Sequence, residues 1–237
     1  MTIVVGVDAA QSPGWVAVTL RDGRLHSMVI QPSLAAVVEA EPTARVVAVD
    51  IPIGHEDPTS GLDQGRRRCD RAAREFLGAG RQASVFWVPP FSVLDAADQT
   101  EAVERCRKKG WIAPSAQLWA MRRRLLEARA LAVDPRLYEV HPEASFQEAL
   151  NLGGKTGHLQ HPKTTWPGLV ERLELLHAAR LRPERSLGGI GRASPDDVLD
   201  ATIAAWSAAR IANKKARPLP AEPPTDPETG RAVAIWI

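Results

Sequence analysis

The chain has 237 residues, of which 44% are hydrophobic and 24% charged, a balance typical of a soluble globular protein with one large domain. The net charge of +2 gives no argument for nucleic-acid binding by itself, and no apolar stretch reaches the ~18 residues of a membrane span. Two separated cysteines, Cys69 and Cys106, and an N-terminal segment without a basic leader predict a reduced, cytoplasmic protein.

The first fifty residues predict most of a sheet. Apolar runs indicate strands at residues 3–8, 15–20, 25–30 and 46–49. The dipeptide Asp22-Gly23 is a strong hairpin signal between the second and third runs. Ser33 is the expected N-cap of a helix over residues 34–40. Because this helix separates the third and fourth strands, we expect a crossover that places the fourth strand parallel to the first.

The remaining chain predicts a helical insertion and then a return to the sheet. Residues 54–134 show little strand pattern and predict helices at 65–77, 100–109 and 115–132. Further elements are expected as a strand at 137–140, helices at 143–150, 167–179 and 194–213, and a last strand at 233–237. We therefore expect a single domain over residues 1–237, with an insertion that serves as a substrate platform or as the surface of a homodimer.

Acidic residues recur where the predicted strands end and where the long helix begins. Asp8 ends the first strand, Asp50 follows the fourth, Glu139 lies in the fifth, and Asp197 and Asp200 are three residues apart on the helix. A carboxylate in a buried strand is costly unless an arginine or a divalent cation neutralises it. Two Mg²⁺ or Mn²⁺ ions ~3.5–4 Å apart would balance about four such charges and form a phosphoryl-transfer site.

Each acid also has a simpler interpretation. Asp8 could cap backbone amides of the following turn, and Asp50 could merely end a strand. Asp197 could answer the helix dipole, whereas Asp200 lies too far into the helix for that role. Glu139 could pair with an arginine of the insertion.

The strand order and the positions of these acids resemble the ribonuclease-H-like fold, an α/β fold with a mixed five-stranded sheet in the order 3-2-1-4-5. The chain is also similar to the family called domain of unknown function 429, whose members are described as predicted ribonuclease-H-like nucleases. The matching stretches are GVDAA, AVDIPIG, RRRCDRAAREFLG, SVFWVPP, YEVHPEASF, HPKTTWPGLVERLELL and DDVLDATIAAWSAAR. The resemblance implies a metal site with Asp8, Asp50, Asp197 and Asp200 as ligands, and it names no substrate.

Basic residues provide candidate contacts to a phosphate backbone. Arg67, Arg71 and Arg74 are spaced to share one face of the first insertion helix, although a solvated face with acidic partners explains the same spacing. His141 could transfer a proton or position a phosphate, and it could equally be a hydrogen-bonded structural histidine. Lys163 and Arg172 fall within a matched stretch and are secondary candidates for phosphate contacts.

Three functions compete. The first is a metal-dependent nuclease that hydrolyses phosphodiester bonds of nucleic acid. The second is an actin-like or sugar-kinase-like phosphotransferase that binds ATP, against which Ala9 and Ala10 stand where such proteins carry a glycine-rich phosphate turn. The third is a non-catalytic metal-binding scaffold, in which metal stabilises the fold and no substrate is cleaved.

Overall fold

The computed structural model describes residues 1–237 except 11–13, 60–62, 184–189 and 192. The chain divides into two compact units. Unit 1 comprises Met1–Ile51, Arg136–Arg217 and Trp236–Ile237, and unit 2 comprises Pro52–Pro135 and Pro218–Ile235. The expected insertion therefore forms the main part of unit 2, where a segment near the C-terminus joins it.

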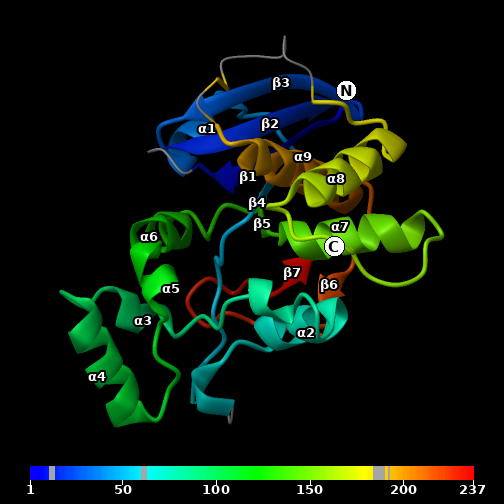
Figure 1. Ribbon diagram of the computed structural model, residues 1–237. Helices are drawn as coiled ribbons and strands as arrows, with labels where there is room; N and C mark the ends of the chain where they lie inside the picture. Colours follow the sequence, from blue (N-terminus) through cyan, green and yellow to red (C-terminus); the bar gives the residue numbers. More distant parts are fainter. Residues whose placement is uncertain (11–13, 60–62, 184–189, 192) are drawn as a thin grey trace. The chain divides into compact units, whose positions relative to one another are not determined.

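A five-stranded mixed sheet forms the centre of unit 1 (Figure 1). Its strands are β1 (Ile3–Ala9), β2 (Trp15–Arg21), β3 (Arg24–Gln31), β4 (Val46–Val49) and β5 (Leu137–Glu139). The order is β3-β2-β1-β4-β5. Strand β2 is antiparallel to both β1 and β3, and β4 is parallel to both β1 and β5. This order confirms the expected ribonuclease-H-like arrangement.

Local signals in the sequence explain where these elements turn and begin. Asp22 and Gly23 both have positive φ angles, 48° and 76°, as a tight two-residue hairpin turn requires. The Ser33 side chain accepts the backbone N–H of Ala36 at 3.0 Å and caps the first helix. The helices of unit 1 are α1 (Leu34–Ala40), α7 (Pro142–Leu152), α8 (Trp166–Ala178) and α9 (Pro195–Ala212).

Helix α9 packs directly onto the sheet, against β1, β2 and β4 (Figure 1). Gly6 of β1 makes this close approach feasible, because a Cβ atom there would lie 1.9 Å from the backbone nitrogen of Ala205. Since side chains alternate along a strand, Val4, Gly6 and Asp8 all face α9. The same face of the sheet carries a large buried apolar cluster with residues of α7, α8 and α9.

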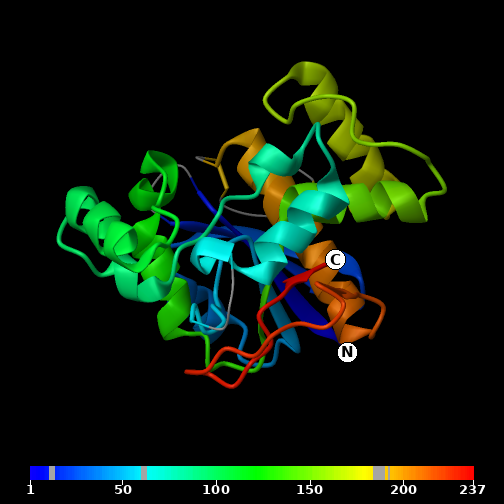
Figure 2. The same ribbon diagram turned by 90° about the horizontal axis from the view of Figure 1, so that it is seen from below.

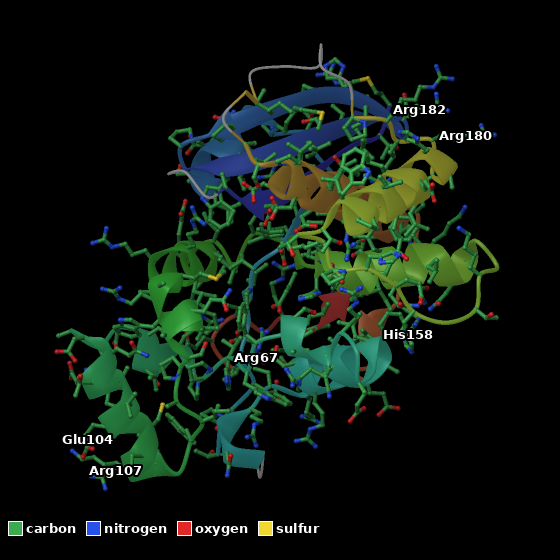
Figure 3. All side chains as sticks on the ribbon, viewed as in Figure 1. Arg67, Glu104, Arg107, His158, Arg180 and Arg182 are labelled. Carbon is green, nitrogen blue, oxygen red and sulfur yellow. The ribbon has the colours of Figure 1, made fainter. Side chains whose placement is uncertain are left out.

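Unit 2 consists mainly of short helices and loops. They are α2 (Arg68–Leu77), α3 (Phe91–Leu94), α4 (Gln99–Lys109), α5 (Ala116–Ala120) and α6 (Arg122–Ala130), with 3₁₀ turns at Asp63–Gly65 and Gln82–Ser84. The single helix expected over residues 115–132 is thus two helices that meet at Met121. Glu104 and Arg107 form an ion pair on the outer side of α4, with 2.9 Å between Oε1 of Glu104 and Nη2 of Arg107 (Figure 3).

The C-terminal part adds β6 (Pro218–Leu219) and β7 (Ile235–Trp236), which form a two-stranded sheet. β6 lies within the segment expected to be a proline-rich linker, and β7 is shorter than the expected last strand. Cys69 and Cys106 are buried free thiols. In the part of the chain that the structure describes, no helix combines the length and the apolar character needed to cross a membrane.

Candidate functional site

Three aspartates from distant parts of the sequence meet on the α9 face of the sheet. Asp8 ends β1, and Asp50 follows β4, where its backbone N–H donates to the carbonyl of Val7 at 2.9 Å. The Asp50 carboxylate accepts a hydrogen bond from the Asp8 carboxyl group. Asp200, in the second turn of α9, acts electrostatically on both. The parallel pairing of β1 and β4 is what brings the first two together, as the sequence predicted.

Lys163 brings a positive charge into this cluster. Its Nζ lies 2.5 Å from Oδ2 of Asp200, and its charge also acts on Asp8 and Asp50. Asp200 is 1% exposed, and its other oxygen, Oδ1, is buried and has no hydrogen-bond partner among the residues that the structure describes. An unsatisfied buried carboxylate oxygen is unusual and costly, so this atom marks where a cation or a donor can bind. We call Asp8, Asp50, Asp200 and Lys163 the acid cluster.

The pKa values of the three aspartates show how strongly the site disfavours their negative charges. Burial, followed by the negative charges of Asp50 and Asp200, raises the pKa of Asp8 well above its usual 3.8. Burial likewise raises the pKa of both Asp50 and Asp200 to about 7, although Lys163 pulls each of them down. Burial lowers the pKa of Lys163, but attraction to Asp200 outweighs it and the net shift is upward. More negative charge is therefore gathered here than one ammonium group balances.

Asp197 has a structural task in addition to its place near the acid cluster. It belongs to a capping box, in which the Ser194 hydroxyl accepts the N–H of Asp197 and the Asp197 carboxylate accepts the N–H of Ser194 at 3.4 Å. This role matches the simpler interpretation of a first-turn acid. The negative charge of Asp197 nevertheless contributes to the raised pKa of Asp8, so the carboxylate lies within electrostatic reach of the acid cluster.

Glu139 lies on the opposite face of the sheet from the acid cluster. In β5, Tyr138 packs against the apolar cluster under α9, so its neighbour Glu139 points the other way. Its charge still contributes to the raised pKa of Asp50. Glu139 therefore acts electrostatically on Asp50 from the other face, and its expected place among the catalytic acids stays a prediction.

Arg172 does not serve as the phosphate contact that its position in a matched stretch suggested. It is 1% exposed and forms a buried ion pair with Glu143 in the first turn of α7. Its guanidinium also donates to the carbonyl of Gly168 at 2.9 Å and to that of His161 at 3.2 Å. Through these bonds Arg172 holds α8 and the loop before it against α7. Arg172 is buried by tertiary contacts, which the residue type alone does not reveal.

Glu143 is the acid that reasoning from the sequence overlooked. It is buried, and its negative charge contributes to the raised pKa of both Asp50 and Asp200. A first-turn acid directly after Pro142 was the available signal, but such acids are common at helix starts. His141 directly precedes α7 and is partly exposed, and its expected role in proton transfer or phosphate positioning stays a prediction.

The arginines of unit 2 do not form the expected shared basic face. Arg67 precedes α2 and is buried in an ion pair with Asp70 at 2.5 Å (Figure 3). Arg74 donates to the carbonyl of Val85 at 2.6 Å and lies over the ring of Trp87, 4.7 Å from its centre. Only Arg71 of the three is exposed. Arg67 and Arg74 thus hold unit 2 together, because burial and loop contacts engage their guanidinium groups.

The fold and the acid cluster define an α/β protein with the ribonuclease-H-like strand order and a buried carboxylate site at the carboxyl ends of two parallel strands. Residues 6–225 match the family described as "Protein of unknown function (DUF429)", and the chain belongs to that family. Searches of curated proteins and of solved structures found no match.

Proposed function

We propose that this protein is a metal-dependent nuclease, which hydrolyses phosphodiester bonds of nucleic acid at the acid cluster. The observation that carries the proposal is the unsatisfied Oδ1 of Asp200, buried beside two further carboxyl groups and one ammonium group. Carboxylate oxygens are the ligands that Mg²⁺ and Mn²⁺ prefer, so the donor set fits either ion. Asp8, Asp50 and Asp200 would hold the metal, which supplies an activated water and stabilises negative charge on the phosphate.

The chain's own residues have distinct tasks in this proposal. Asp8 and Asp50, hydrogen bonded to one another, fix the orientation of their carboxyl groups at the ends of β1 and β4. Lys163 holds Oδ2 of Asp200 and leaves Oδ1 for the metal. Because its own pKa is raised, Lys163 keeps its proton at neutral pH and offers a positive charge to an incoming phosphate.

The balance of charge bears on the number of ions. With a metal bound, the three carboxyl groups would release their protons, including the proton that Asp8 donates to Asp50. Together with one ammonium group they would then carry two negative charges, which a single divalent cation neutralises. If Asp197 turns from its capping role and joins the site, three negative charges remain, and the two ions expected from the sequence become favourable. Isothermal titration of the metal-free protein with Mn²⁺ measures the stoichiometry, and the same titration of Asp197→Asn shows whether that residue holds a second ion.

The direct test is cleavage of labelled single-stranded, duplex and hybrid DNA and RNA with Mn²⁺, Mg²⁺ or EDTA. The test variant is Asp8→Asn, and the matched control is Asp22→Asn, the same change on an exposed turn of unit 1. We expect metal-dependent cleavage that Asp8→Asn lowers by about 100-fold or more, since even supporting residues of metal sites cost 10–100-fold. Equal cleavage by Asp8→Asn and the wild type would contradict the proposal.

The ion pair between Lys163 and Asp200 also favours a second candidate, the metal-binding scaffold. A lysine that already neutralises part of the cluster allows the fold to persist without catalysis. This candidate predicts that EDTA lowers the unfolding temperature while none of the nucleic-acid substrates is cleaved. No observation favours the phosphotransferase. Part of the turn on which that alternative depends, residues 11–13, lies outside the described residues.

A further inference from the structure

A second feature of unit 1 is a pocket beside α8. Its volume is about 580 Å³, within the range of small-ligand sites. It is bordered by the end of α7, by the loop that follows and by one side of α8. The two helices lie side by side in Figures 1 and 2. No role assigned to the acid cluster uses this pocket.

The walls of the pocket divide into an apolar part and a polar part. Leu150 and Leu175, both nearly buried, contribute apolar surface together with Val170. Trp166, the first residue of α8, also lines the pocket and is 74% exposed. Tryptophan is usually well buried, so an indole that lines a pocket and faces water is a ready surface for stacking a planar ring.

The polar part comes from a segment with two lysines and two histidines. Between Gly153 and Trp166 the chain carries Lys155, His158, His161 and Lys163 and no acidic residue. The first three of these side chains line the pocket, and Figure 3 shows His158 on the loop after α7. The segment thus offers donors and positive charge to a phosphate.

Two acids of α8 also line the pocket. The carboxylate of Glu171 accepts the backbone N–H groups of Gln160 and His161 at 2.8 Å and 3.2 Å, so its negative charge is engaged in holding the loop. Glu174 is exposed in the next turn. The lysine and histidine side chains therefore gather on the loop, and the acids lie along α8.

The loop connects this pocket to the acid cluster over a very short distance. His161 lines the pocket and Lys163 binds Asp200, so the Cα atoms of the two positions are at most ~7.6 Å apart. The connection is also rigid, because Arg172 holds the carbonyl of His161. Gly168 lets α8 lie against Pro162, whose carbonyl oxygen would be 2.0 Å from an added Cβ.

We propose that this pocket is a subsite for an unpaired nucleotide of a single-stranded nucleic acid. Its base stacks on Trp166 over the apolar wall, its phosphate contacts Lys155 and the histidines of the loop, and the strand continues past Lys163 to the acid cluster. The proposal rests on the proposed function for the reaction that the strand then undergoes. The subsite predicts that the acid cluster prefers single-stranded nucleic acid to a duplex, because a paired base has no free face on which the indole can stack.

The test measures binding without cleavage, by fluorescence anisotropy of labelled oligothymidylate and oligouridylate of about 12 nucleotides in EDTA. We expect Trp166→Ala to weaken binding by about 5- to 150-fold, which corresponds to the stacking of one base. Trp166→Phe should retain most of the affinity. Lys155→Ala should weaken binding and should make the affinity depend less steeply on salt concentration. The control is Leu152→Ala, an exposed apolar residue at the end of α7 that does not line the pocket.

The possible outcomes separate this subsite from the proposed hydrolysis. Unchanged affinity of Trp166→Ala, or no binding by the wild type, overturns the subsite, even if the wild type cleaves nucleic acid. Weaker binding by Trp166→Ala, together with no cleavage by the wild type under any metal, supports the subsite and contradicts the hydrolysis. Two competitors identify the occupant. If a mononucleotide or a duplex displaces the oligonucleotide as well as an unlabelled single strand does, the single-stranded occupant is overturned.

Discussion

Replacing Lys163 with methionine removes the positive charge from the acid cluster and keeps a long, flexible side chain. Asp200 then loses the partner of its Oδ2, while its Oδ1 already has none among the described residues. Removing one member of a fully buried ion pair costs about 3–5 kcal/mol. The Lys163 side chain is 40% exposed, so water screens part of the interaction. We therefore expect Lys163→Met to lower the free energy of unfolding by about 2–3 kcal/mol.

Urea unfolding at pH 7.5 in EDTA measures this loss, with Lys108→Met as the control. Lys108 is 70% exposed and pairs with Glu104 at 3.5 Å on α4, so its removal should change stability by less than about 0.5 kcal/mol. Saturating Mn²⁺ should restore more stability to Lys163→Met than to the wild type, because a metal at 100 times its Kd contributes about 2.7 kcal/mol and the variant presents more negative charge. Equal losses in the two lysine variants would refute the idea that Lys163 neutralises the acid cluster.

Three further predictions concern the acid cluster and its support. Gly6→Ala should destabilise the protein by about 3 kcal/mol or more in thermal unfolding, since the new Cβ meets the α9 backbone, whereas Gly80→Ala, with open space around it, should change little. In metal-free protein, Asp50 has a folded pKa of about 7 and an unfolded value near 3.8, so the folded state holds the extra proton between these values. Its contribution to stability is present below pH 4 and is lost as the pH rises to 7, by ~4 kcal/mol at most, and urea titrations should show a shallower decline for Asp50→Asn. Arg172→Met should cost about 3–5 kcal/mol by breaking a buried ion pair, and a loss under 1 kcal/mol in urea unfolding would contradict that assignment.

The sheet and the three aspartates of the acid cluster could be predicted because their signals are local. Asp22-Gly23 sets a hairpin, and the helix after Ser33 forces a parallel crossover. Once β4 is parallel to β1, Asp8 and Asp50 must end on neighbouring strands. The α9 helix, with its Ser194 cap, was equally legible.

The features that could not be predicted are those that tertiary contacts decide. Glu139 lies on the face of the sheet opposite Asp8 because the register of β5 against β4 determines the face of each β5 side chain. The sequence of a three-residue strand does not specify that register. The residue type alone does not distinguish Arg67 and Arg172 from solvent-facing arginines. Each has a buried acidic partner that only the fold reveals. Lys163 belongs to the acid cluster because buried contacts at the start of α8 hold its loop in place.

The division of the chain has a consequence for its synthesis. The chain passes between the two units after Ile51, Pro135, Arg217 and Ile235, so neither unit is one continuous stretch. When β4 leaves the ribosome, roughly 160 residues remain before α9 is complete, which takes roughly 8–30 s at 5–20 residues per second. During that interval the apolar face of β1 and β4 has no α9 to cover it, and nascent chains with such exposed sheets are prone to aggregate. The protein should therefore depend on chaperones during translation more than a chain of its size with contiguous units.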